Sequence, residues 1–220
     1  MPGRRKRFVA TRSRSDPPRR REISATPGEL EDPISLFEGW FSEAVASGIK
    51  LPEAMALATA SRAGVPSVRM VLLRGLEDGR FAFFTNYESR KGRELDRNPR
   101  ASLLFYWPSL ERQVRIEGTV RKLTRRESSE YFQTRPRESQ LAAWASAQSS
   151  VIPSREALEA EFELAQTRFD GKEVPCPRFW GGYQLIPNQI EFWQGREHRL
   201  HDRRSYEKQR RGWKVVVLAP

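Results

Sequence analysis

The feature that most constrains the fold of this chain is a series of short strand-like segments joined by tight turns. Residues 54–60 form a short apolar run, residues 67–74 form a second strand pattern, and the turn Ala63-Gly-Val-Pro66 separates them. The sequence Glu77-Asp-Gly79 then favours a hairpin turn into a third strand at residues 80–85. Strands joined by connections this short pair antiparallel, so the sequence predicts an antiparallel meander.

Further strand patterns follow, with helical patterns inserted between them. Strands are expected at residues 101–107, 113–120, 183–186 and 213–218, and in a C-terminal hairpin spanning residues 190–203. A first helix is expected from Ser35, where a capping box with Glu38 opens it, to Gly48, which stops it. A second is expected from about Ser89 to Asn98, and a third from Thr124, where a capping box with Glu127 opens it, to Phe132. Two more are expected at residues 138–147 and 155–169. Seven or eight strands with inserted helices indicate an α+β fold built on an antiparallel barrel or sandwich.

Both histidines of the chain fall in the C-terminal hairpin. Taken as two extended arms about a turn at residues 195–198, its second arm alternates so that Arg199, His201 and Arg203 share one face. Cations lined up on one strand face repel each other unless an anion lies among them. This face is therefore predicted to be half of an anion-binding site. A solvated hairpin with ordinary surface arginines is the alternative interpretation.

A second anion-binding pattern stands at the expected helix start near residue 89. Free N–H groups at a helix start, the hydroxyl of Ser89 and the adjacent cations Arg90 and Lys91 form a plausible phosphate cradle. Basic residues after a turn are common, and no Gly-rich Walker or dinucleotide pattern surrounds this one, which counts against a nucleoside-triphosphate enzyme. In a neighbouring strand, Arg69 and Arg74 lie on opposite faces, where snorkelling to solvent is the alternative.

Most of the net charge of +11 is concentrated in a tail. Residues 1–22 hold eight arginines and one lysine against two acidic residues, a net of +7, so the rest of the chain carries only +4. Rich in Arg, Ser and Pro, this segment cannot bury enough apolar surface to fold alone. We expect residues 1–32 to be disordered and residues 33–220 to form the folded domain. A solvated tail is the first interpretation; contact with RNA or an acidic surface, a targeting role and closure over a site are the alternatives.

Other patterns exclude several classes of protein. No run of about 18 apolar residues is present, so no membrane span is expected. The lone Cys176 has no disulfide partner, which favours a reducing, cytoplasmic setting. His198 and His201 have no Cys or third His to complete a ligand set, so no metal site is predicted. The surplus of arginines, with Gln, Ser and aromatic groups such as Trp193, suits a phosphorylated planar ligand and a cofactor that brings its own chemistry.

Eight segments carry a specific pattern when taken together in their order. They are Ser67-Val-Arg-Met-Val-Leu-Leu-Arg74, Phe83-Phe-Thr-Asn86 with Ser89-Arg-Lys91, Glu111-Arg-Gln-Val-Arg115, Tyr131-Phe-Gln-Thr-Arg-Pro-Arg-Glu-Ser139, Gln148-Ser-Ser-Val151, Phe179-Trp-Gly-Gly182, Glu191-Phe-Trp-Gln-Gly195 and Arg199-Leu-His-Asp-Arg203. Any one of them is a weak signal. Their order over residues 33–220 resembles the signature of the pyridoxamine 5′-phosphate oxidase family.

The resemblance implies an FMN-binding split β-barrel of about six antiparallel core strands with surrounding helices. It implies a homodimer with FMN at the interface and an oxidoreductase that converts pyridoxamine 5′-phosphate or pyridoxine 5′-phosphate to pyridoxal 5′-phosphate. In such an enzyme hydride passes from C4′ of the substrate to N5 of the flavin, and O2 reoxidises the flavin to give hydrogen peroxide. The activity serves vitamin B6 biosynthesis and salvage.

The resemblance also assigns roles position by position. The residues that would hold FMN are Arg69, Met70, Val71, Leu72, Leu73, Arg74, Phe84, Thr85, Arg90, Lys91, Gln113, Gln148, Ser149, Trp193 and Arg203. The residues that would hold the substrate are Arg74, Tyr131, Arg135 and Ser139 at its phosphate, and Arg199, Leu200 and His201 at its ring. Arg199 and His201 would be the catalytic pair, because they fix the pyridine ring against the flavin.

One position departs from the family pattern, because members usually carry lysine where this chain has Arg74. Arginine keeps the charge but is larger and forked, so phosphate binding is expected with a changed geometry. Two alternatives to the oxidase stay open. A split-barrel flavin oxidase of the phenazine-biosynthesis type would have a different substrate, although Tyr131, Arg135 and Ser139 argue against it. A nucleic-acid-binding role for the basic tail predicts binding that falls steeply with salt.

Overall fold

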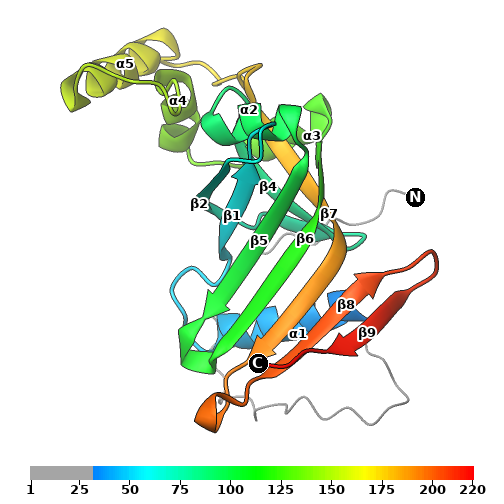
Figure 1. The fold of residues 1–220 in the computed structure, drawn as a ribbon. Coiled ribbons are helices and arrows are strands. Elements are labelled where there is room, and N and C mark those ends of the chain that lie inside the picture. The colour runs from blue at the N-terminus through cyan, green and yellow to red at the C-terminus, as the bar shows by residue number, and fades with distance from the viewer. Residues whose placement is uncertain (1–31) are drawn as a thin grey trace, which may run out of the picture.

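The computed structural model describes residues 32–220, and the predictions made for residues 1–31 lie outside that range. The boundary between tail and domain therefore stays a prediction. The described chain forms the following elements in order (Figure 1): α1 (Pro33–Ala46), β1 (Ala54–Ala60), β2 (Pro66–Leu72), β3 (Gly75–Glu77), β4 (Arg80–Asn86), α2 (Arg90–Arg97), β5 (Arg100–Trp107), η1 (Pro108–Leu110), β6 (Arg112–Lys122), α3 (Arg125–Gln133), α4 (Arg137–Ala145), α5 (Arg155–Arg168), β7 (Trp180–Gln194), η2 (Glu197–Arg199), β8 (Asp202–Lys208) and β9 (Trp213–Val217).

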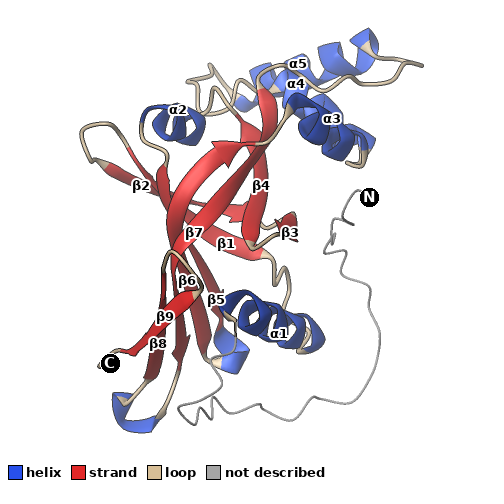
Figure 2. Ribbon diagram, turned by 90° about the vertical axis from the view of Figure 1, so that its right-hand side faces the viewer, coloured by secondary structure: helices blue, strands red, loops and turns tan. Residues whose placement is uncertain are grey.

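The nine strands described join one antiparallel sheet. The strand order is β2-β1-β5-β6-β7-β4-β3, and β8 and β9 extend the sheet from β7. Strand β7 links the two parts of the sheet, because its first half pairs with β4 and its second half pairs with β8, while β6 runs along its other side. Figure 2 shows the resulting curl. The predicted α+β fold with an antiparallel split barrel is confirmed, although it has more strands than expected.

The length of β7 corrects one prediction. Residues 183–186 and the first arm of the hairpin belong to one strand of 15 residues rather than to two. Proline inside a strand normally marks a break, since it lacks the N–H that the ladder needs. The register of β6 against β7 shifts between Glu117 and Gly118, opposite Pro187. A β-bulge therefore accommodates the proline within a continuous strand.

Helix α1 supplies the aromatic centre of the main core. Phe37, Trp40 and Phe41 are buried. The ring of Phe37 meets those of Phe81 and Phe105 edge-on, with centroids 5.0 Å apart in both pairs. The apolar residues whose spacing predicted this helix thus form the face that packs against the sheet, beside which α1 lies in Figure 2.

The start of α1 corrects a second prediction. The helix begins at Pro33, and Asp32 caps it by accepting a hydrogen bond from the backbone N–H of Ser35 at 3.1 Å. The predicted capping box of Ser35 with Glu38 is therefore wrong. Aspartate is as good a cap as serine, and proline is favoured at the first helical position, so Asp32 and Pro33 favour the earlier start.

Helices α2 to α5 gather at the end of the sheet opposite α1 (Figure 1). Helices α3, α4 and α5 enclose a second, smaller core around Phe132, Leu141 and Trp180. The predicted helix start near Ser89 is confirmed, with Ser89 as the N-cap of α2, and the capping box that opens α3 is also confirmed. Among the helices of residues 32–220, none has the length and apolar character needed to cross a bilayer.

The connection between β7 and β8 corrects a third prediction. Strand β8 begins only at Asp202, and the short turn η2 precedes it. His198 and Arg199 have left-handed backbones, with φ of 55° and 62°. Arg199 therefore lies in the connection and does not share a strand face with Arg203. Nothing in the local pattern signals this, because residues other than Gly rarely adopt that conformation.

Candidate active site

An open cleft of about 470 Å³ lies among β2, β4 and the helices at their end of the sheet. Its lining contains ten of the predicted site residues: Met70, Val71, Leu72, Arg74, Phe84, Thr85, Lys91, Tyr131, Arg135 and Gln148. It also contains residues to which the sequence assigned no role: Asn86, Ala142, Ala143, Ser146 and Trp180. Segments far apart in the sequence thus meet in one concave site, which we call the cleft.

Lys91 provides a buried cation on one wall of the cleft. Its ammonium donates to Thr85 Oγ1 at 3.2 Å and to Gln148 Oε1 at 2.9 Å. Burial, with a smaller contribution from the nearby charge of Arg69, lowers the pKa of Lys91 to about 8. The first turn of α2 sits so close to the preceding turn that a Cβ at Gly92 would lie 2.0 Å from the carbonyl oxygen of Tyr87. The backbone around Lys91 is therefore tightly fixed.

Aromatic rings form another wall. The rings of Phe84 and Tyr131 are stacked, with their centroids 3.8 Å apart. The ring of Trp180 is stacked with both, and its centroid lies 5.4 Å from that of Phe84 and 6.3 Å from that of Tyr131. The guanidinium of Arg135 lies 4.7 Å from the centre of the Trp180 ring. A planar apolar surface with a cation at its edge is suited to an aromatic ligand that carries an anionic group.

Arg135 is the least satisfied charge of the cleft. Its Nη1 is buried and has no hydrogen-bond partner within the described range, and burial lowers the pKa of the group. A buried guanidinium donor without an acceptor is costly, so the position of Arg135 is suited to binding an anion. Arg74, on the same cleft, forms an ion pair with Glu53 at 3.6 Å between Nη1 and Oε1.

A second hollow, of about 280 Å³, lies on β5 to β8 and is lined by Gln113, Arg115, Glu191, Trp193 and Arg203, among others. Strand register places Gln113, Trp193 and Arg203 in one row across three strands, so their side chains share a face. Glu191 anchors Arg203 by accepting from its Nε at 2.9 Å. We call this second hollow the strand hollow, and we call Gln113, Trp193 and Arg203 the anchored row.

His201 lies at the edge of the strand hollow. Its ring centre is 4.6 Å from that of Trp193, and its Nδ1 accepts a hydrogen bond from the backbone N–H of Arg196 at 3.1 Å. In a neutral imidazole that bond leaves the proton on Nε2, which is then available as a donor. Arg199 and Leu200 are exposed in the connection nearby.

The cleft and the strand hollow lie far apart on one chain. No residue lines both. The cleft is lined by residues of α2, α3 and α4 as well as of β2 and β4. Both ribbon views show these helices at one end of the sheet and the connection between β7 and β8, which holds His201, at the opposite end (Figures 1 and 2). Most of the predicted site residues therefore fall into two groups that a single chain does not bring together.

Two family profiles match the chain, one over residues that include most of the cleft and one over its last three strands. The family profile described as pyridoxamine 5′-phosphate oxidase matches residues 41–169, which include most of the cleft. The chain belongs to the pyridoxamine 5′-phosphate oxidase family. Residues 180–220, which carry β7 to β9, match the profile described as the pyridoxine 5′-phosphate oxidase C-terminal dimerisation region. The family match supports a homodimer that acts on a small molecule.

Individual relatives agree with this membership. A pyridoxine/pyridoxamine 5′-phosphate oxidase of Rubrobacter xylanophilus is 54% identical over 196 residues, which are 89% of this chain and 90% of the relative. One of Coxiella burnetii is 51% identical over 191 residues, 87% of this chain and 97% of the relative. This member of the pyridoxamine 5′-phosphate oxidase family is accordingly an oxidoreductase of that type.

Solved structures share the fold. PhzG from Burkholderia lata, in complex with tetrahydrophenazine-1-carboxylic acid, has a TM-score of 0.83 and 33% identity, covering 90% of this chain and 98% of that one. An FMN-binding protein of Nostoc punctiforme related to pyridoxamine 5′-phosphate oxidase has a TM-score of 0.68 at 17% identity, which shows likeness of fold alone.

Some predicted residues of this oxidase-family chain line neither the cleft nor the strand hollow. Arg69 and Arg90 bond to Glu94 beside the cleft, the side chain of Leu73 is in the main core, and Ser139 is half-buried in α4. Ser149 lines a separate hollow beside α5. Their roles stay predictions. Sequence reasoning also gave no role to Trp180, although Phe179-Trp-Gly-Gly182 was among the segments that carried the resemblance.

Proposed function

We propose that this protein oxidises pyridoxamine 5′-phosphate or pyridoxine 5′-phosphate with O2 to pyridoxal 5′-phosphate and hydrogen peroxide, using FMN bound between two copies of the chain. The observation that carries the proposal is the presence of two separate cations in one cleft, Lys91 and Arg135, of which Arg135 has no hydrogen-bond partner for its Nη1 among the described residues. Two cation positions beside an aromatic wall suit two phosphate monoesters, one on a cofactor and one on a substrate. A cytoplasmic location, favoured by the single cysteine, is part of the proposal.

The residues present fit FMN. Within the described range Lys91 bonds only to hydroxyl and amide oxygens, so its ammonium has no carboxylate to neutralise it and is suited to a phosphate. On the strand hollow, Trp193 offers a ring face, and Gln113 and Arg203 offer donors in the same row. When bound, FMN would accept a hydride from C4′ of the substrate and would be reoxidised by O2.

A second copy of the chain would bring a strand hollow to each cleft. The face that carries the strand hollow continues by register from Arg115 through Leu104 and Ala56 to Met70. On that face Met70 is 63% exposed and Tyr106 is 56% exposed, which is unusual for large apolar side chains in a row. Contact between two such faces would bury them and would support the homodimer that the dimerisation profile indicates.

Within this arrangement the protein would contribute binding, orientation and donors. Arg135, with Arg74 and Tyr131, would hold the substrate phosphate, and the aromatic wall would exclude water from its ring. His201, with Nδ1 fixed by the backbone, would present an Nε2 donor, and Arg199 would supply a positive charge over the ring. These groups come from the connection between β7 and β8 of the partner copy.

The pKa of Lys91 predicts how flavin binding depends on pH. Below about pH 8 the ammonium is charged and binds phosphate fully. Above that value the free protein loses the proton, so binding requires proton uptake, and we expect the affinity for FMN to be about tenfold lower at pH 9 than at its plateau. Flavin fluorescence titrations of apoprotein between pH 7 and 9.5 measure this. In Lys91→Arg the charge persists over the whole range, so its profile should be flat; equal slopes in both proteins would contradict the assignment.

The two arginines near the strand hollow should fail in different ways. Arg199→Ala is expected to raise KM and lower kcat with flavin still bound, because Arg199 is exposed in the connection and lies outside the anchored row. Arg203→Ala should weaken flavin retention first, because Arg203 is held in the row by Glu191. Flavin content after gel filtration, measured beside the kinetics, separates the two. If both variants lose flavin equally, the division is wrong.

The direct test is a visible spectrum of the purified protein followed by a peroxide assay. A yellow protein that forms hydrogen peroxide with pyridoxine 5′-phosphate or pyridoxamine 5′-phosphate supports the proposal. A flavin-loaded protein that is inactive on both would contradict it. The likeness to PhzG makes a phenazine precursor the second substrate to assay. The buried Nη1 of Arg135, which has no acceptor among residues 32–220, favours the phosphorylated substrates over a phenazine precursor.

A further inference from the structure

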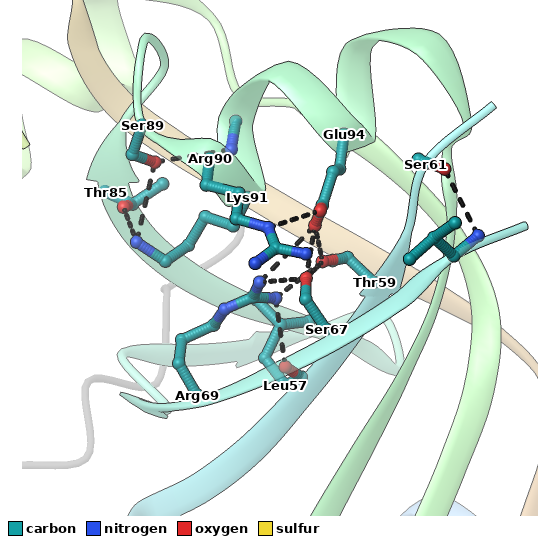
Figure 3. A network of polar contacts seen from close by, with 12 residues as sticks. Leu57, Thr59, Ser61, Ser67, Arg69, Thr85, Ser89, Arg90, Lys91 and Glu94 are labelled. Carbon is teal, nitrogen blue, oxygen red and sulfur yellow. Dashed lines mark hydrogen bonds and ion pairs between the residues drawn. The ribbon is translucent and has the colours of Figure 1, made fainter. Parts of the chain in front are cut away.

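Glu94 of α2 is a buried carboxylate that collects donors from three elements (Figure 3). It accepts hydrogen bonds from Thr59 Oγ1 of β1 at 2.5 Å, from Ser67 Oγ of β2 at 2.6 Å and from Arg90 Nε at 2.9 Å. Arg69 Nη2 lies 3.4 Å from the same oxygen that the hydroxyls bond. Burial alone would raise the pKa of Glu94, but the bonds from Ser67, Thr59 and Arg90 together lower it to about 2. The group is therefore charged at every pH at which the enzyme would work.

The same network fixes Arg69. Its Nη1 donates to the carbonyl oxygen of Leu57 at 3.1 Å and to Thr59 at 2.5 Å, and its Nη2 donates to Ser67 at 2.5 Å. Four acceptors, including Glu94, thus surround one guanidinium whose side chain is only 20% exposed. Arg69 is also near enough to lower the pKa of Lys91 by its charge. Arg69 and Lys91 are thus two cations held close together, and the carboxylate of Glu94 offsets their repulsion.

We propose that Glu94 is a positioning residue for the phosphate of FMN, holding Arg69 and Arg90 beside Lys91 so that the three cations meet the phosphate together. This inference rests on the proposed function. Three cations and one carboxylate leave a net charge of +2, which matches a phosphate monoester dianion. No role for Glu94 follows from the sequence pattern, because its partners lie 27 and 35 residues away.

Removing the carboxylate has two opposing effects on anion binding. Coulomb's law alone predicts tighter binding, since the site becomes more positive. Against this, Arg90 is already 58% exposed and would turn to solvent without its partner, and Arg69 and Lys91 would repel each other. A phosphate would then have to bring the cations together at the moment of binding. We expect the lost preorganisation of the cations to outweigh the Coulomb gain, because removing the carboxylate removes several short contacts at once.

The test compares FMN with riboflavin, which lacks the phosphate, in fluorescence titrations of apoprotein. In Glu94→Gln we expect the affinity for FMN to fall about tenfold and the affinity for riboflavin to stay within about twofold. Glu43→Gln is the matched control. Its carboxylate ties α1 to β6 through Arg112 at 2.7 Å, lines neither the cleft nor the strand hollow, and should change neither affinity.

Three results would overturn the inference. Equal weakening of FMN and riboflavin would show that Glu94 only ties α2 to the sheet, and unchanged or tighter FMN binding would show that the Coulomb effect prevails. Wild-type protein that binds neither flavin would overturn the proposed function itself, and the inference with it.

If Glu94→Gln does not fold, Thr59→Val replaces it, since every charge is kept while one donor to Glu94 and one acceptor for Arg69 are lost. A threefold loss of FMN affinity in that variant supports the inference, and no loss contradicts it.

Discussion

Replacing Lys91 by methionine is expected to weaken FMN binding by about 100-fold, equivalent to about 2.7 kcal/mol, so that the protein purifies without flavin. Methionine keeps the length of the side chain but removes the buried cation that is suited to the phosphate, and bonds between charged groups out of water are the strongest polar contacts. Flavin content after purification and a titration of apoprotein with FMN measure the effect.

The matched control for this variant is Lys122→Met. Lys122 is a surface cation paired with Asp96 at 3.0 Å, and its removal should leave flavin content unchanged. The thermal midpoint of Lys91→Met apoprotein should not fall by more than a few degrees, because burial already disfavours the charged form of Lys91. Retention of flavin by the variant would place the cofactor phosphate elsewhere.

Replacing Arg135 by methionine is expected to lower kcat/KM for pyridoxine 5′-phosphate by about two to three orders of magnitude while flavin stays bound. The guanidinium contacts no acceptor through Nη1 in the described chain, so its donor is free for the substrate phosphate. For the same reason the substitution removes an unsatisfied buried group, and the thermal midpoint should hold or rise. Steady-state kinetics test the expected loss in kcat/KM, and thermal unfolding of the same preparation tests the expected midpoint.

Arg137→Met distinguishes this effect from general damage to α4. Arg137 donates to the carbonyl oxygens of Lys172 at 2.9 Å and Phe169 at 2.6 Å, outside the cleft. We expect that variant to lose stability and to keep its kinetic constants. If Arg135→Met loses stability as well and its KM is unchanged, Arg135 serves the fold rather than the substrate.

The local parts of the fold could be predicted from the sequence. The start of α2 after Ser89 and the capping box of α3 depend on residues within four positions of each other, and both elements begin where expected. Strand β1 also has the predicted bounds, Ala54–Ala60, because turn residues delimit an apolar run on both sides.

The features that failed depend on contacts across the chain. The continuity of β7 through Pro187 is set by a bulge against β6, and the left-handed backbone at His198 and Arg199 has no glycine to announce it. The donors that meet at Glu94 come from β1 and β2. Side-chain alternation within one strand cannot show any of these.

Candidate residues were easier to predict than their arrangement. The resemblance assigned binding roles to Lys91, Arg135, Trp193 and Arg203, because motif order does not depend on knowing the fold. Each of these residues lines the cleft or the strand hollow, and their roles stay predictions. It did not show that they lie at opposite ends of one chain. That division is a property of the sheet, and it is the reason that the proposed site includes a second copy.

The most direct test of an active site shared between two copies is a mixed dimer of Lys91→Met and Arg203→Ala chains, isolated through two different affinity tags. If each site combines the cleft of one copy with the strand hollow of the other, one site collects both substitutions and the second site is intact. We predict that each parent variant is nearly free of flavin, while the mixed dimer binds about half the wild-type FMN and has about half the wild-type activity. A mixed dimer with no more flavin or activity than its parents would contradict the shared site.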